Sequence, residues 1–251
     1  MGLGAIFLPG GVMPADLAYG PLLDALGADV EAIAKDLEVY AGPEPPPDYT
    51  LDNEIDGVLR TARDAGFERF HLVGYSGGGA ASVAFAARHP ERLSSLALLE
   101  PAWMGRAGLG PEEQAVWREF DRIATLAPEA MMPAFVANQL APGVAAPPPP
   151  PGPPPPWMAT RPAGLRALLD TFSSSTLDVD RLRAFPGPVY FALGGMSNPD
   201  YFGRMAERAR AIFADFTLDV FQERHHFDPP HRLEPDRTAR ALRAHWARAD
   251  L

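Results

Sequence analysis

The stretch Gly74-Tyr75-Ser76-Gly77-Gly78 places a serine between a short apolar run at 70–73 and small residues with helical spacing at 80–88. This order of strand, turn and helix around Gly-x-Ser-x-Gly is typical of a nucleophile elbow. The strained turn exposes the serine hydroxyl, and the glycines let neighbouring segments pass closely. The motif predicts serine chemistry at Ser76, with an ordinary glycine-rich loop before a helix as the simpler alternative.

Length and composition limit the class of protein. The 251 residues, 47% hydrophobic and 22% charged, suffice for one well-cored domain or one domain with a small insert. The formal net charge of −10 disfavours partners that present phosphates, so we expect no nucleic-acid or membrane partner. The absence of cysteine excludes disulfides, thiolate nucleophiles and thiolate metal ligands. Serine, threonine and carboxylate side chains remain as candidate nucleophiles.

The sequence also indicates in which cellular compartment the protein is expected. No basic leader precedes the apolar run near the N-terminus, and no stretch approaches the roughly 18 apolar residues of a spanning helix. We therefore expect a cytoplasmic protein.

Apolar runs and helical stretches alternate over most of the chain. Strands are predicted at 5–8, around 34–40, and at 70–73, 95–99, 188–193 and 217–222. Helices are predicted at 16–26, 50–63, 80–88, 201–213 and 235–248. This alternation predicts an α/β fold with a parallel sheet and helices on both faces. Sites in such sheets lie at the carboxyl ends of the strands, where Ser76, Glu100 and His225-His226 fall.

Residues 102–187 interrupt the alternation and carry no strand pattern. Helices are predicted there at 112–126, 129–140 and 163–172, with a proline-rich segment at 147–156. We expect a helical cap on a core formed by residues 1–101 and 188–251. The proline-rich segment is predicted to be a stiff strap between cap helices rather than a ligand for proline-binding domains. The apolar side chains of the cap favour a hydrophobic acyl substrate.

The order of glycine turn, serine elbow, acid, cap and late histidine resembles the α/β-hydrolase fold family, over essentially the whole chain outside the cap. The family usually has two more strands before the glycine turn, which here comes at Gly10-Gly11. The resemblance therefore implies a trimmed sheet of about six strands. It also implies a serine hydrolase that cleaves a carboxylic ester, thioester or lactone through an acyl-serine intermediate, with no cofactor and no metal.

The resemblance implies roles for two side chains first. Ser76 is expected to be the nucleophile, and a histidine in the loop after the last strand is expected to remove its proton. That loop contains His225 and His226. His226 is preferred because His226-Phe227, followed by prolines and a helix, looks like the family's histidine loop, and His225 is the alternative.

The acid of the resembling family most often follows the strand that here ends near Leu193. That loop has Asn198 before Pro199, and an asparagine cannot compensate the charge of an imidazolium. A subset of the family places the acid after the strand that follows the elbow helix, where this chain has Glu100. Glu100 is therefore the preferred acid and Asp200 the second candidate.

An oxyanion hole is expected from two backbone amides, one after the nucleophile and one after the first strand. The resemblance assigns these to Gly77 and Gly11. The family's usual histidine-glycine pair is replaced by Pro9-Gly10, so Val12 is an alternative donor.

Two other kinds of function stay open. The same triad serves C–C bond hydrolysis, lyase reactions and cofactor-free haloperoxidation in this fold family. The missing acid at the usual position and the missing early strands are compatible with a non-catalytic binding protein of the same fold. Dehalogenase and epoxide-hydrolase chemistry is disfavoured because it needs a carboxylate where this chain has Ser76.

Overall fold

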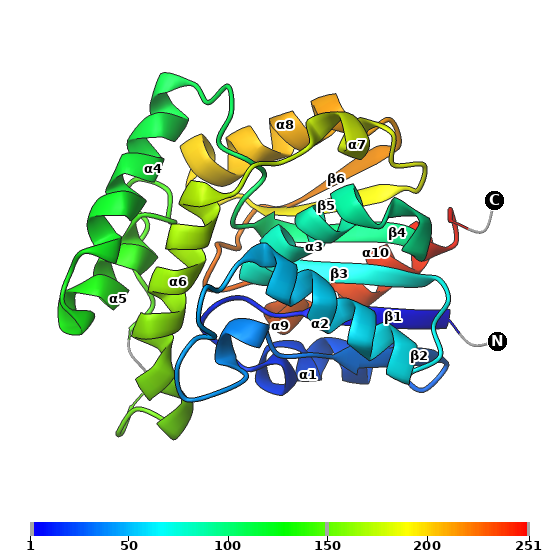
Figure 1. Ribbon diagram of the computed structural model, residues 1–251, viewed down its shortest axis with the longest axis horizontal. Coiled ribbons are helices and arrows are strands. Elements are labelled where there is room, and N and C mark those ends of the chain that lie inside the picture. Colours follow the sequence, from blue (N-terminus) through cyan, green and yellow to red (C-terminus); the bar gives the residue numbers. More distant parts are fainter. Residues whose placement is uncertain (1–2, 149–150, 250–251) are drawn as a thin grey trace.

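The computed structural model describes residues 3–148 and 151–249, in which six strands form one sheet in the order β2-β1-β3-β4-β5-β6. The strands are β1 (Leu3–Leu8), β2 (Val30–Ala34), β3 (Phe70–Ser76), β4 (Leu93–Pro101), β5 (Val189–Gly194) and β6 (Phe216–Phe221). All neighbouring strands run parallel, so their carboxyl ends meet at one edge of the sheet (Figure 1). The predicted α/β fold with about six strands is confirmed.

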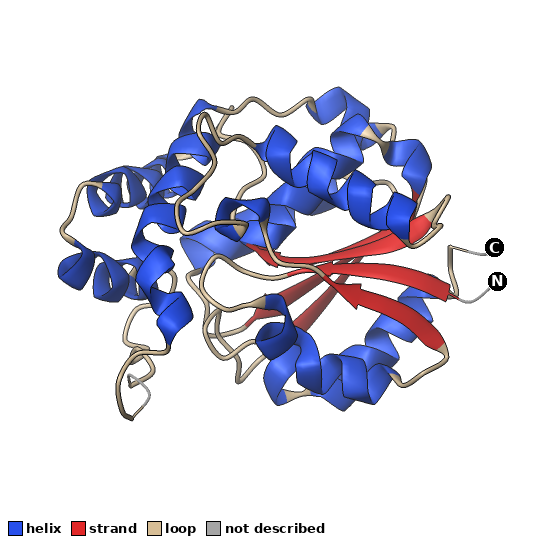
Figure 2. Cartoon of the chain, turned by 60° about the horizontal axis from the view of Figure 1, so that its bottom comes forward, coloured by secondary structure: helices blue, strands red, loops and turns tan. Residues whose placement is uncertain are grey.

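Helices cover both faces of the sheet (Figure 2). One face packs against α1 (Ala15–Leu26), α9 (Pro230–Leu233) and α10 (Pro235–Trp246). The other packs against α2 (Leu51–Asp64), α3 (Gly77–Arg88) and α8 (Arg204–Ile212). The central strands are apolar on both sides, as expected for a sheet that is covered on both faces. Within the described ranges, no helix has the length and apolar character to cross a membrane.

The named elements in the described parts of the segment between β4 and β5 are all helical, and irregular chain connects them. The segment contains α4 (Pro111–Ala124), α5 (Pro128–Ala137), a 3₁₀ turn (Pro156–Thr160), α6 (Arg161–Ser174) and α7 (Val179–Arg183). Helices α4, α5 and α6 lie together beyond the carboxyl ends of the strands (Figure 1). The three helices predicted in this segment are present, whereas α7 is too short to give a periodic pattern. Residues 149 and 150 of the predicted proline strap lie outside the described residues.

One strand prediction was wrong. The strand expected around 34–40 is instead β2 at Val30–Ala34, and Glu38–Tyr40 form a 3₁₀ turn. The carboxylate of Glu54 on α2 accepts hydrogen bonds from the amides of Glu38 (2.9 Å) and Val39 (3.1 Å). These amides are bound to a side chain and cannot pair with a neighbouring strand, so the extended segment ends before them.

The elbow depends on glycine at position 78, because there the helix passes directly over the end of β1. A Cβ at Gly78 would lie 2.3 Å from the carbonyl oxygen of Leu8 and 2.5 Å from that of Pro9. Both atoms belong to the backbone and cannot move aside without displacing β1. Gly78→Ala is therefore expected to lower the free energy of unfolding by about 3 kcal/mol, at the upper end of ordinary overpacking costs.

The control for this substitution is Gly20→Ala, in the middle of α1. A Cβ at Gly20 would meet no atom within 4 Å, so alanine should raise the free energy of unfolding by about 0.5–1 kcal/mol. Urea denaturation of both variants measures the two changes. If Gly78→Ala and Gly20→Ala changed the free energy of unfolding equally, the close contact between Gly78 and the end of β1 would be contradicted.

Candidate active site

Ser76 lies at the end of β3 and directly precedes α3, without a capping hydrogen bond from its side chain. Its backbone has φ 52° and ψ −116°, a conformation that a residue with a side chain rarely adopts. The amide of Gly78 donates a hydrogen bond to the carbonyl of Pro9 (2.9 Å), which ties the loop after β1 to the elbow. The predicted strand-turn-helix setting of the serine is present.

Three side chains that are remote in sequence form a continuous hydrogen-bonded chain. The His226 Nε2 atom is 3.0 Å from Ser76 Oγ, and His226 Nδ1 is 3.0 Å from Glu100 Oε2. All three are nearly excluded from solvent, with exposed fractions of 6% for Ser76, 1% for His226 and 3% for Glu100. In this arrangement the carboxylate fixes the imidazole tautomer so that Nε2 is free to accept the serine proton.

The imidazole of His226 is held by aromatic contacts. Its ring stacks on Phe202, with 4.3 Å between centroids and 17° between planes, and lies against Tyr75 at 4.9 Å. The Tyr75 hydroxyl donates a hydrogen bond to the His226 carbonyl oxygen. Burial raises the pKa of Tyr75 well above its usual value, so this phenol stays protonated and remains a donor. The ring is thereby fixed in position from both sides and through its backbone.

Glu100 owes its position to an irregularity in the sheet. The register between β3 and β4 pairs Tyr75 with Leu99 but Ser76 with Pro101, which leaves Glu100 as an extra residue with φ 47°. Such a bulge redirects a side chain at the end of a strand. Its second oxygen, Oε1, accepts a hydrogen bond from the amide of Gly194 at the end of β5 (2.8 Å).

The alternative site residues lie elsewhere. The Nδ1 atom of His225 accepts a hydrogen bond from the Phe227 amide (3.2 Å), and burial lowers its pKa. Asp200 is exposed at the start of a π-helical turn, and Asn198 caps that turn by accepting from the Asp200 amide (3.0 Å). The Asn198 side-chain amide also donates to the Asn138 carbonyl (2.8 Å). The asparagine at the family's usual acid position therefore links the core to the segment after α5.

The two expected oxyanion donors, Gly11 and Gly77, lie close together. A Cβ at Gly77 would lie 3.4 Å from the amide nitrogen of Gly11, so the two backbones are in close approach. Neither amide donates a hydrogen bond to any other described residue. Free amides at a helix N-terminus and in the preceding loop are the arrangement that binds a developing oxyanion.

Two residues that the sequence did not indicate hold the loop with Gly11. The Tyr40 hydroxyl donates to the Gly11 carbonyl (2.5 Å), and Arg161 Nε donates to the Val12 carbonyl (2.7 Å). The Arg161 guanidinium lies 3.9 Å from the Tyr40 ring centroid, a favourable cation–π distance. Because these contacts join residues far apart in the chain, no local motif could have identified them.

Two small cavities adjoin Ser76. The inner cavity, about 20 Å³, lies between the elbow and the helices beyond the sheet; it is lined by Gly11, Ser76, Gly77, Ala102, Phe120, Phe135, Gln139, Leu165, Leu168, Leu169, Phe172 and Tyr201. The histidine-side cavity, about 70 Å³, is lined by Gly10, Gly11, Val12, Met13, Ala18, Tyr75, Ser76, Phe135, His226, Phe227, Pro229, His231 and Arg232. The inner cavity has room for about one water molecule. His226 lines only the second.

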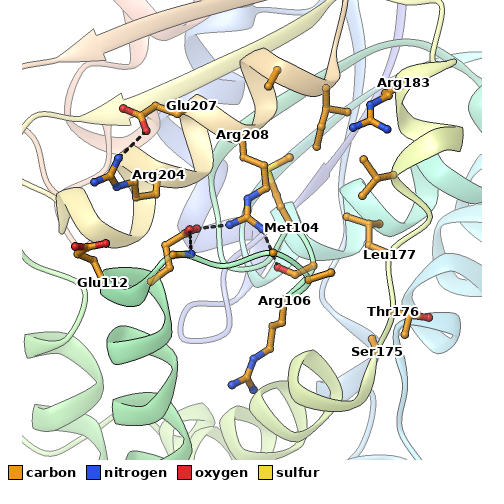
Figure 3. A pocket seen from close by; sticks show the side chains of 18 residues that line it. Met104, Arg106, Glu112, Ser175, Thr176, Leu177, Arg183, Arg204, Glu207 and Arg208 are labelled. Carbon is orange, nitrogen blue, oxygen red and sulfur yellow. Dashed lines mark hydrogen bonds and ion pairs between the residues drawn. The ribbon is translucent and has the colours of Figure 1, made fainter.

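A much wider hollow, about 920 Å³, is lined by none of the candidate catalytic or oxyanion-hole residues (Figure 3). Its arginines are already paired with carboxylates, for example Arg208 with Glu113, and Arg204 with Glu207 at 3.1 Å. Volume alone does not mark a site, and the chemistry-bearing groups converge on the small cavities instead. In the described part of the chain no cluster of three or more histidines and carboxylates could hold a metal ion.

Comparisons with solved structures identify proteins of the same fold. A carboxylesterase structure from the thaumarchaeon Nitrososphaera gargenis is 19% identical, with TM-score 0.72 over 99% of this chain and 91% of that one. An esterase from Thermogutta terrifontis is 17% identical, with TM-score 0.70 over 99% and 91%. A meta-cleavage product hydrolase from Pseudomonas fluorescens is 18% identical, with TM-score 0.65 over 99% and 92%. A comparison with curated proteins gives no significant match.

The comparison with protein families agrees with the architecture. The family described as "Alpha/beta hydrolase family" matches residues 5–241, nearly the whole chain. With its six-stranded parallel sheet, its serine elbow and this match, the chain belongs to the alpha/beta hydrolase family.

Proposed function

We propose that this hydrolase is a serine esterase that cleaves a carboxylic ester, thioester or lactone through an acyl-serine intermediate. Ser76 is the nucleophile, His226 the general base and acid, and Glu100 the residue that orients the imidazole. Gly11 and Gly77 supply the oxyanion hole. The observation that carries the proposal is the unbroken hydrogen-bonded chain Ser76–His226–Glu100, with 3.0 Å at both links.

The reaction proceeds in two halves. Ser76 Oγ attacks the carbonyl carbon while its proton moves to His226 Nε2, and the amides of Gly11 and Gly77 bind the new oxyanion. Collapse of this adduct breaks the bond to the leaving group, which takes the proton from His226. A water molecule then attacks the acyl-serine with His226 as base, and the carboxylic acid is released. No step requires a cofactor.

The test is a panel of p-nitrophenyl esters, a thioester and a lactone assayed with the unmodified protein and with Ser76→Ala. Turnover that depends on Ser76 would support the proposal. If the protein is folded by circular dichroism and cleaves no substrate of the panel, the proposal is contradicted.

We further propose that residues 102–187 act as a cap over this site and that the acyl group is small and apolar. The inner cavity is walled by leucines of α6: a Cβ at Gly11 would lie 2.9 Å from Leu168 Cδ1 and 3.0 Å from Leu165 Cδ2. Its volume leaves little room beyond the reacting carbonyl. The acidic surface and the small apolar site together favour a small hydrophobic acyl compound, rather than nucleic acid or membrane, as the partner.

Leu168→Ala is expected to shift the acyl preference toward longer chains. Removing three side-chain carbons beside Ser76 should raise the ratio of kcat/KM for butyryl over acetyl p-nitrophenyl ester by about tenfold, since one methylene in such a pocket changes rates by about 10–200-fold. Leu182→Ala is the control, because Leu182 is fully buried on α7 but lines neither cavity. An unchanged ratio in Leu168→Ala would show that another wall limits the acyl group.

A second candidate is C–C bond hydrolysis by the same residues. It is favoured by the structural similarity to a meta-cleavage product hydrolase, which covers 99% of this chain, as the Thermogutta esterase does, at a TM-score of 0.65 against 0.70. Parallel assays of esters and vinylogous 1,5-diketones separate the two candidates. If the protein cleaves the diketones but not the esters, C–C bond hydrolysis is the function and the esterase proposal is wrong.

A further inference from the structure

The roles proposed above determine on which side of Ser76 each half of the substrate lies, and the inference below rests on that proposed function. His226 must deliver a proton to the leaving oxygen or sulfur, so the leaving group lies beside the imidazole. Of the two cavities, only the histidine-side cavity is lined by His226. It therefore receives the leaving group, and the inner cavity receives the acyl group.

A positively charged side chain lines the histidine-side cavity. Arg232, on the short helix α9, is half-buried there and makes no ion pair or side-chain hydrogen bond with any other described residue. Two carboxylates that flank it in the sequence are already bound to other arginines, and the exposed Asp236 makes no ion pair with it. Arg224 binds Asp228 (2.8 Å) and Glu234 (2.9 Å), and Arg237 also contacts Glu234 (3.3 Å).

The other polar groups around Arg232 do not neutralise it. Burial lowers the pKa of the adjacent His231 to about 3, so its imidazole is uncharged, and the Tyr75 phenol stays protonated. Apolar side chains of Val12, Met13 and Phe227 complete the wall of the cavity. Arg232, which lines the cavity assigned to the leaving group, thus has no carboxylate within ion-pair distance in the described chain.

Arg232 differs from the other partly buried arginines of the described chain, each of which binds a carboxylate, a carbonyl or an aromatic ring; Arg118 and Arg240, which also lack a partner, are exposed. With 32 acidic residues against 22 basic ones, a carboxylate partner is readily found, as for Arg204 and Arg208 in the wide hollow (Figure 3). A guanidinium offers several donors in a rigid fork that suits carboxylate and phosphate oxygens. Its lack of a partner is most simply explained if the partner is a ligand.

We propose that the natural substrate carries an anionic group on its leaving alcohol or thiol, and that Arg232 binds this anion. A carboxylate and a phosphate present the same chemistry to the guanidinium, so both are tested below. Val12, Met13 and Phe227 line the same cavity as His226 and Arg232, and their apolar side chains would contact the carbon atoms that separate the reacting oxygen from the charge.

The experiment compares substrates with the same acyl group and different leaving groups. Acetyl esters of 4-hydroxybenzoate and 4-hydroxyphenyl phosphate are anionic, and the acetyl ester of methyl 4-hydroxybenzoate is neutral. The protein should cleave one or both anionic esters with kcat/KM at least tenfold above the neutral one, mainly through a lower KM. The more strongly favoured ester identifies the anion as carboxylate or phosphate.

Arg232→Gln should lower kcat/KM for the favoured anionic ester by about tenfold to hundredfold, the range expected for a hydrogen bond to a charged group. The neutral ester should change by less than twofold, and Arg232→Lys should restore part of the loss. Arg240→Gln is the matched control, because Arg240 is exposed on α10, lines neither cavity and also lacks an ion-pair partner in the described chain.

Two results would overturn this inference while leaving the esterase proposal intact. One is an unmodified protein that cleaves all three esters equally well in a Ser76-dependent manner. The other is an Arg232→Gln variant that loses activity equally on anionic and neutral esters, which indicates a structural role. Absence of cleavage of any ester by folded protein would instead overturn the esterase proposal, and this inference with it.

Discussion

Ser76→Ala is expected to lower kcat for ester hydrolysis by about 10⁶-fold, the loss seen when the nucleophile of a serine triad is removed. The reason is that no acyl-enzyme can form without the hydroxyl, and the remaining oxyanion amides and binding cavities give only a small residual rate. The measurement is steady-state hydrolysis of p-nitrophenyl acetate by the purified variant.

The control for this variant is Ser174→Ala. Ser174 is exposed at the end of α6 and donates only to the Asp170 and Thr171 carbonyls, so its loss should leave kcat unchanged. Both variants should keep the thermal unfolding midpoint of the unmodified protein within a few degrees. A Ser76→Ala variant with full activity would show that the elbow serine is not the nucleophile.

Glu100→Gln is expected to lower kcat by about 10³–10⁴-fold while changing KM little. A glutamine of the same shape can still accept the Gly194 amide through its carbonyl oxygen, so the bulge in β4 is preserved. Its NH₂ group, however, would face His226 Nδ1 and favour the tautomer with the proton on Nε2. That tautomer cannot remove the Ser76 proton, which is the known cost of replacing a triad carboxylate by its amide.

Asp200→Asn is the matched test of the alternative acid. Asp200 is exposed and makes no hydrogen bond to His226, so its amide variant should retain kcat within about twofold. If Asp200→Asn were the more damaging of the two substitutions, the assignment of Glu100 would be wrong.

The parts of the site that could be predicted from sequence are those fixed by local order. The elbow motif requires a strand before Ser76 and a helix after it, and the parallel sheet places Glu100 and the loop after β6 at the same edge. In the structure it is His226, not His225, that lies within hydrogen-bond distance of Ser76 and Glu100. The sequence alone could not make this choice, because adjacent residues in a loop differ only in the direction of their side chains.

Other features depend on contacts between distant residues. The strand expected at 34–40 ends early because the Glu54 carboxylate, on the following helix, binds two of its amides. The hydrogen bonds of Tyr40 and Arg161 to the loop with Gly11 join residues 29 and 149 positions apart, and neither residue type is unusual in its local sequence. Helix α7 has only 5 residues, far fewer than the roughly 11–18 over which helical periodicity can be recognised, so the sequence pattern could not reveal it.

The most direct test of the central claim is covalent labelling with diisopropyl fluorophosphate, followed by peptide mass spectrometry. The reagent is small and reports activation of the serine without knowledge of the substrate. We expect one adduct, on Ser76, that is abolished in His226→Ala and slowed in Glu100→Gln. Leu168→Ala, which opens the inner cavity, is assayed in parallel so that restricted access is not mistaken for lack of activation. An unlabelled Ser76 in both the unmodified protein and Leu168→Ala, with both folded, would contradict the account.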